Sequence, residues 1–76
     1  MRIGGWPVFD RYPLLREVIV NLKTDHAFRG VLWRRARGYL VLRNVTLLRQ
    51  AEAPLAVDGE VMIERANVDF VQVVSR

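Results

Sequence analysis

Three arginines, Arg34, Arg35 and Arg37, crowd a short gap between two apolar runs in the stretch GVLWRRARGYLVLR, which Arg43 closes. Guanidinium groups packed this densely cannot all be buried without paired carboxylates, so we expect them to be exposed at the tip of a hairpin. Their chemistry is contact with an anion, either a phosphate backbone or an acidic protein surface. Phosphate binding would weaken as the salt concentration rises, because it releases counterions.

Three interpretations of this arginine tip remain open. It binds phosphate, it is a solvated hairpin end whose charge keeps the chain soluble, or it forms bridges between subunits. From His26 to Ala51 there are six arginines and no acid, whereas from Glu52 onwards there are five acids and two arginines. This asymmetry favours the bridge or another protein contact. The candidate bridge partners are Glu52, Asp58, Glu60 and Glu64.

Two aromatic residues, Trp33 and Tyr39, flank the arginine tip. Aromatic side chains in such a place can stack on the bases of a single-stranded nucleic acid. Two aromatic residues at the end of a hairpin more often pack against each other across the strands, and we favour this interpretation.

No set of residues in the sequence indicates catalysis. His26 is the only histidine, and no second histidine or cysteine completes a metal site. No Ser, Thr, Lys or carboxylate pair has a spacing that indicates a nucleophile and its base. GGWP (4–7) lacks the Lys-Ser/Thr of a phosphate-binding loop. We therefore expect a non-catalytic protein that takes no metal, no cofactor and no small-molecule substrate.

The composition describes one small domain that needs a partner. A chain of 76 residues without cysteine has no disulfide, and a chain of this size buries only about 60–65% of the surface that it exposes when unfolded. Because 51% of the residues are apolar, we expect part of the apolar surface to be covered by another copy or a larger protein. No run of residues reads as a membrane span or a secretory signal. The expected location is the cytoplasm, or a virion assembled in the host cytoplasm.

Alternating polarity predicts five short strands. EVIVNLK (17–23) alternates with period two and is rich in β-branched residues. Five strands with almost no helix predict an all-β fold, namely a small, strongly bent barrel. The other four strands are expected at 27–34, 39–49, 60–65 and 68–74.

Proline and glycine residues predict where the strands end or bend. Residues 50–59 are expected to form a loop, because they contain Pro54 and end in an Asp-Gly turn signal. Gly30 in mid-strand marks a sharp bend where the sheet curls. The alternation also predicts which side chains point into the barrel. They are Val20, Leu22, Phe28, Leu32, Leu40, Leu42, Ile63 and Val71.

The first sixteen residues are expected to form an irregular N-terminal arm, followed by a barrel over residues 17–76. Two glycines and two prolines in this segment prevent it from forming one helix. The arm carries Trp6 and Phe9, which are candidate anchors in a neighbouring subunit or partner. Capping of the open end of the barrel is an equal alternative for these two side chains.

The layout of the chain resembles the Sm-like family of small β-barrels. VNLKTDHAFRGVL (20–32) resembles the first Sm motif, and YLVLRNV (39–45) is similar to the end of that motif. VMIERANVDFVQVV (61–74) resembles the second Sm motif. The resemblance covers roughly residues 17–74 and implies a bent five-stranded barrel. It further implies that the fourth strand pairs with the fifth strand of the next subunit, in RNA-binding rings of commonly six or seven subunits.

The departures from the family fall on its RNA-binding positions. The family's Asp and Asn between the second and third strands fall near Ala36 and Tyr39, in a loop one residue shorter. Its Arg-Gly pair falls on Glu64 and Arg65. A carboxylate at Glu64 repels phosphate where the family's arginine attracts it. The resemblance therefore implies the barrel and not the family's uridine pocket.

These observations lead to two candidate functions. The favoured one is a non-catalytic assembly subunit that associates with itself or docks on a larger protein complex, for which a bacteriophage particle is one candidate setting. The alternative is an Sm-like ring that binds RNA or DNA through the arginine-rich tip. Salt-dependent binding to nucleic acid separates the two functions.

Overall fold

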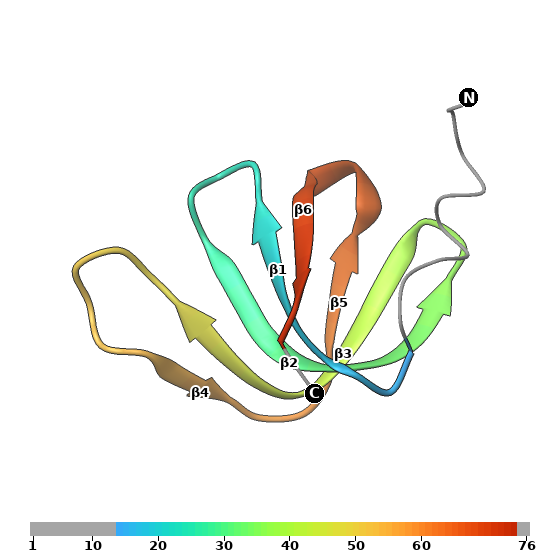
Figure 1. Cartoon of the computed structure of the whole chain (residues 1–76), viewed down its shortest axis with the longest axis horizontal. Coiled ribbons are helices and arrows are strands. Elements are labelled where there is room, and N and C mark those ends of the chain that lie inside the picture. The colour runs from blue at the N-terminus through green and yellow to red at the C-terminus, as the bar shows by residue number, and fades with distance from the viewer. Residues whose placement is uncertain (1–13, 75–76) are drawn as a thin grey trace.

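A computed structural model describes residues 14–74, and its strands form one antiparallel sheet that curls into an open barrel (Figure 1). The all-β class is confirmed. The predicted anchors Trp6 and Phe9 lie outside the described residues. In chain order the strands are β1 (Glu17–Leu22), β2 (Ala27–Ala36), β3 (Tyr39–Leu48), β4 (Leu55–Val57), β5 (Val61–Glu64) and β6 (Val68–Val73), with the short 3₁₀ helix η2 (Arg65–Asn67) between the last two.

Strand β3 is the centre of the sheet, because it pairs along its length with three other strands. It runs antiparallel to β2, while its first half pairs with β5 and its second half with β4. The remaining ladders join β2 to β1 and β1 to β6. Within the described chain, β5 pairs only with β3, and β6 pairs only with β1. Each of these two strands therefore has one edge without a backbone partner among the described residues, as does β4, which pairs only with β3.

The bend predicted at Gly30 is confirmed by the packing of β2 against β3. Gly30 is buried, and a Cβ atom there would lie 2.8 Å from the backbone oxygen of Arg43 and 3.2 Å from a methyl group of Val45. Opposite Gly30, β3 carries an extra residue in its register with β2, and Asn44 there takes a positive φ of 53°. This bulge, together with a residue that has no side chain, lets the two strands cross closely and turn.

A second bulge lies on β2 at Trp33. Leu32 pairs with Leu42 and Arg34 pairs with Val41, so Trp33 is extra in the ladder. A bulge interrupts the alternation of faces along its own strand. The side chains on either side of Trp33 therefore do not follow the period-two pattern that the rest of β2 obeys.

All eight residues that the sequence predicted inside the barrel belong to the core or pack against it. Val20, Leu32, Leu40, Leu42 and Ile63 are buried, whereas Leu22, Phe28 and Val71 are half-buried against them. Two further core residues, Val18 and Val45, were not predicted. Val41 is also buried, on the opposite face of β3 from Leu40 and Leu42.

The prediction that residues 50–59 form one loop is wrong for Leu55–Val57, which forms β4. This strand exists because the bend in β3 turns its second half away from β5 and leaves it free to pair with another segment. In Figure 1, β3 curves from the β2–β3 hairpin on the right to β4 on the left. Among the described residues, no helix is long and apolar enough to cross a membrane.

Candidate nucleic-acid interface

The loop that carries the arginine tip is shorter than the sequence predicted. Strand β2 extends to Ala36, so Arg34 and Arg35 lie in the strand, opposite Val41 and Leu40. Only Arg37 and Gly38 remain in the turn, where Gly38 takes a positive φ of 79° that favours glycine. The expectation that all three arginines lie in the gap at the hairpin tip is therefore wrong for Arg34 and Arg35, which lie in β2.

The three arginines face in different directions. Residues that are directly paired across an antiparallel ladder share a face of the sheet. Arg35 is paired with the core residue Leu40, so its side chain starts on the core-facing side, and it is half-buried. Arg34 is exposed on the outer face, and Arg37 is exposed in the turn. The arginine tip is therefore not one patch, and the predicted exposure does not hold for Arg35.

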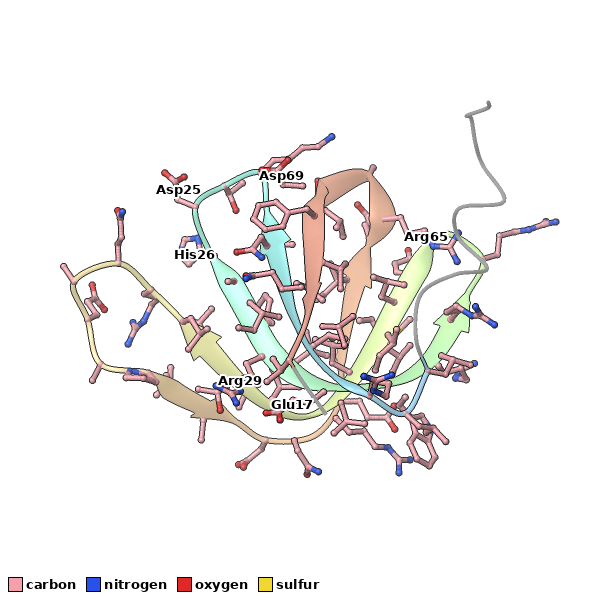
Figure 2. The ribbon with its side chains drawn as sticks, viewed as in Figure 1. Glu17, Asp25, His26, Arg29, Arg65 and Asp69 are labelled. Atoms are coloured by element: carbon pink, nitrogen blue, oxygen red, sulfur yellow. The ribbon has the colours of Figure 1, made fainter. Side chains whose placement is uncertain are left out.

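The hairpin turn lies against the end of β5, which is far away in the sequence. The backbone N–H of Arg65 donates a hydrogen bond of 2.9 Å to the carbonyl oxygen of Gly38. Tyr39 is paired with Glu64 across the β3–β5 ladder. Figure 2 shows Arg65 at the end of the barrel where the β2–β3 hairpin turns. We call Arg35, Arg37, Tyr39, Glu64 and Arg65 the hairpin cluster.

The hairpin cluster joins the two segments that the Sm resemblance places at the RNA-binding positions. Its three guanidinium groups outnumber its one carboxylate, so the cluster carries a net positive charge. Arg65 is half-buried and Arg37 is exposed. The position of Arg65 beside the turn could not be derived from charge spacing, because only the β3–β5 pairing brings it there. Chemically, the cluster can attract an anion but holds no residue set for bond making.

Trp33 does not lie opposite Tyr39, whose direct partners are Ala36 and Glu64. The guanidinium carbon of Arg43 instead lies 3.7 Å from the centroid of the Trp33 ring. Such a cation–π contact is a favourable arrangement for a half-exposed arginine. The favoured prediction of packing between two aromatic residues is therefore replaced by an Arg–Trp stack on the outer face.

Two of the acids proposed as partners in other subunits form ion pairs within the chain. Arg43 Nε donates a hydrogen bond of 2.8 Å to Glu60 Oε2, and Arg49 contacts Glu52 at 2.7 Å. The described residues place neither Arg34 nor Arg37 in an ion pair. These two cations are the part of the predicted site that is left for an external anion.

A further ion pair ties β1 to β2 on the outer face. Arg29 Nε donates a hydrogen bond of 2.7 Å to Glu17 Oε2, and Figure 2 shows the two side chains together. This hydrogen bond, with the attraction between the two charges, raises the pKa of Arg29. Arg29 thus stays charged at all physiological pH values, and its carboxylate partner makes it a less available anion contact than Arg34 or Arg37.

His26 has an ordinary role in the β1–β2 turn. Its Nδ1 forms a hydrogen bond of 3.1 Å with the carbonyl oxygen of Thr24. No group of three or more His, Cys, Asp or Glu side chains in residues 14–74 is arranged to hold a metal ion.

Within residues 14–74 three strands have a free edge, namely β4, β5 and β6, and exposed apolar side chains lie on β5 and β6. Met62 of β5 is 57% exposed, and Phe70 and Val73 of β6 are 53% and 45% exposed. Met62 is paired with Val41, and Phe70 with Asn21, so both side chains lie on the outer face. Apolar side chains beside an unpaired strand edge are typical of a surface that another chain covers.

Solved structures with the same architecture include two archaeal Sm proteins. The Sm protein of Pyrococcus abyssii, solved in complex with a uridine heptamer, is 26% identical, with a TM-score of 0.73 over 90% of this chain and 94% of that chain. A heptameric archaeal Sm protein is 20% identical, with a TM-score of 0.74 over 92% of this chain and 100% of that chain. A chain of the NatC complex, crystallised with bound CoA, is 21% identical, with a TM-score of 0.71 over 97% of this chain and 90% of that chain. Neither a family model nor a curated protein matches the sequence.

The chain therefore has an Sm-like fold. The match extends over nine-tenths or more of both chains in each comparison, so it describes the whole barrel and not a shared hairpin. The resemblance inferred from the two sequence motifs is thereby confirmed at the level of the fold.

Proposed function

We propose that the protein is a non-catalytic Sm-like subunit that assembles with its own copies into a ring and binds single-stranded RNA at the hairpin cluster. The observation that carries the proposal is the pair of free edges on β5 and β6, each flanked by exposed apolar side chains. A strand edge of this kind is satisfied when it pairs with a complementary edge. Pairing β5 of one copy with β6 of the next is head-to-tail, and such contacts close into rings.

The outer-face side chains make this pairing specific to the chain. Met62 and Phe70 both lie on the outer face. When β5 of one copy lies beside β6 of the next, these two side chains come together along the seam. A methionine sulfur packs favourably against an aromatic ring. The seam would therefore bury Met62 and Phe70, which are the most exposed apolar side chains of β5 and β6.

RNA is the proposed ligand because of charge and of the structural neighbours. Assembly repeats the hairpin cluster once in every subunit, and with it the exposed cation of Arg37. Repeated cations bind a phosphate backbone with little regard to sequence. One structural neighbour was solved with a uridine heptamer, and another is heptameric, which supports both parts of the proposal. Glu64 opposes phosphate within the cluster, so contact through Arg37 and Arg65 would differ from the family's pocket.

The proposal is tested by the mass of the protein in solution, with and without a single-stranded RNA. Light scattering after size exclusion should give a discrete multiple of 8.8 kDa, and fluorescence anisotropy should show binding of an oligouridine that weakens as salt is added. A stable monomer at high concentration would overturn the assembly. An oligomer without RNA affinity at low salt would overturn the RNA-binding part only.

A second candidate function is supported by a different observation. One structural neighbour is a chain of the NatC complex, so a barrel of this shape also occurs within an assembly of several proteins. In that case the free edges of β5 and β6 would pair with a larger protein, and Arg34 and Arg37 would contact its acidic surface. Coexpressed partners, and no self-association, would favour this candidate. The bacteriophage setting stays a prediction from the sequence, without support from the fold.

A further inference from the structure

A hollow of about 390 Å³ lies on the surface at the bend of β3, away from the hairpin cluster. It forms because β3 changes partner there. Leu42 is paired with Val61 and Val45 with Val57, and the residues between these two pairs are not paired with each other. The hollow is lined by Arg43, Asn44, Val57, Asp58, Gly59 and Glu60.

The side chain of Arg43 is fixed from two sides at the wall of this hollow. Its guanidinium carbon lies 3.7 Å from the centroid of the Trp33 ring, and its Nε donates to Glu60 Oε2 at 2.8 Å. Both contacts leave the two terminal amino groups of Arg43 to other acceptors. A donor held in place before binding loses little conformational entropy when a ligand arrives.

The other groups of the hollow are acceptors or mixed. Asp58 forms no ion pair within the described residues, so its carboxylate has two oxygens to accept hydrogen bonds. Asn44 adds an amide that both donates and accepts. The lining of the hollow thus includes both the fork of Arg43 and the carboxylate of Asp58, and its volume is near the lower end of the roughly 300–1,000 Å³ that is common for small-ligand sites.

This combination selects among ligands. A free phosphate is disfavoured by the carboxylates of Asp58 and Glu60, and the terminal amino groups of Arg43 repel a metal ion or an ammonium group that is brought close to them. A ligand that engages both side chains must carry acceptors for the arginine and donors for the carboxylate. Guanine does so, because O6 and N7 accept from the fork of an arginine. Its N1–H and 2-amino group then point two parallel donors at a carboxylate.

We propose that the hollow at the bend of β3 is a guanine-binding site. Arg43 donates to O6 and N7 of the base, and Asp58 accepts from N1–H and the 2-amino group. Trp33 and Glu60 act as positioning residues for Arg43. The site belongs to one chain, so it does not depend on assembly, and it lies apart from the proposed RNA contact at Arg37. The base can come from a free nucleotide or from a strand.

The test is a titration followed by NMR on the ¹⁵N-labelled full chain with GMP, IMP and AMP. GMP should shift the backbone signals of Asn44 and Gly59 and the indole N–H of Trp33 to saturation. IMP lacks the 2-amino group and should bind about tenfold more weakly, because one hydrogen bond to a charged acceptor is lost. AMP, which has neither O6 nor N1–H, should produce no saturating shift at these residues.

Two variants make the test specific. Asp58→Asn should remove the difference between GMP and IMP, whereas Asp69→Asn, an exposed acid of β6 outside the hollow, should leave it unchanged. Both positions are exposed, and thermal unfolding by circular dichroism checks that each variant is folded. Equal affinity for the three nucleotides, or a difference between GMP and IMP that survives Asp58→Asn, would overturn the proposal.

A second experiment shows whether the guanine belongs to a free nucleotide or to a nucleic-acid strand. A uridine pentamer with one central guanosine is compared with the same strand carrying inosine, in an Arg37→Ala background that weakens the proposed backbone contact. A preference for guanosine of about tenfold assigns the site to a base within a strand. GMP binding without such a preference assigns it to a free nucleotide. Because failure of RNA binding at Arg37 leaves the GMP titration intact, the two proposals fail separately.

Discussion

The backbone of Gly30 lies so close to β3 that a Cβ atom at residue 30 would be 2.8 Å from the carbonyl oxygen of Arg43. That oxygen belongs to the backbone of β3, where Arg43 is paired with Val31 of β2, so it cannot rotate away as a side chain would. The close crossing of β2 and β3 therefore depends on a missing methyl group.

Gly30→Ala is expected to lower the free energy of unfolding by up to about 3 kcal/mol, because the methyl group forces the strands apart. Gly38→Ala is the matched control. It meets no atom within 4 Å, and costs only the strain of a positive φ, about 1 kcal/mol. Urea unfolding followed by circular dichroism measures both. Equal losses for the two variants would show that the crossing at Gly30 is not tight.

Leu40→Ala is expected to cost about 2–5 kcal/mol of unfolding free energy, since the side chain is fully buried and leaves a cavity. Leu55→Ala removes the same atoms from a side chain that is 49% exposed, and should cost about 0.5 kcal/mol or less. The same denaturation experiment reports both values. A loss below about 1 kcal/mol for Leu40→Ala would mean that Leu40 does not fill the barrel.

Met62→Glu and Phe70→Glu should each shift the protein from oligomer to monomer while the β-type circular dichroism is retained. Both side chains are more than half exposed in the single chain, so a charge there does not disturb its core. In the proposed seam the charge would be buried without a partner. Leu55→Glu on β4 places the same charge at another exposed apolar side chain and should leave the mass in solution unchanged. Loss of assembly with all three variants would indicate general surface stickiness instead of a seam along β5 and β6.

Arg37→Glu should weaken RNA binding and reduce its salt dependence, because Arg37 is exposed in the turn beside Arg65. The slope of log affinity against log salt should fall by about 0.7 for each phosphate contact removed from a single strand. Arg34→Glu makes the same change of charge on the outer face and should have the smaller effect. Anisotropy titrations at several salt concentrations supply the slopes, and a larger effect at Arg34 would move the RNA path to the outer face.

Much of this barrel can be predicted from alternation, and most failures occur where alternation is interrupted. Val18 is the exception, because it was omitted although it alternates regularly with Val20. The eight predicted core residues are correct because, up to each of them, the alternation within its predicted strand is unbroken. Val45 was missed because the bulge at Asn44 shifts the inward face of β3 by one residue. β4 was missed because three residues are too few to show a period, and a proline next to them reads as loop.

The directions of the arginines show the same limit. Strict alternation from Leu32 would put Arg34 on the core-facing side and Arg35 on the outer face. The extra residue Trp33 exchanges the two. The position of a bulge depends on how the sheet curls in the tertiary fold. No local sequence pattern at Trp33 therefore predicts the bulge. The proximity of Arg65 to the turn likewise follows from strand pairing alone.

The pairing of β1 with β6 has a consequence for the order of folding. The other ladders join strands that are close along the chain, whereas Val18 and Val73 meet from its two ends. Closing that long loop costs entropy that a few hydrogen bonds must offset, so docking of β6 is expected to come late. In native-state hydrogen exchange the amides of β6 should open before those of β2 and β3. While β6 is undocked, it can pair with β1 of another copy instead of its own. Subunits can therefore exchange this strand during the last step of folding.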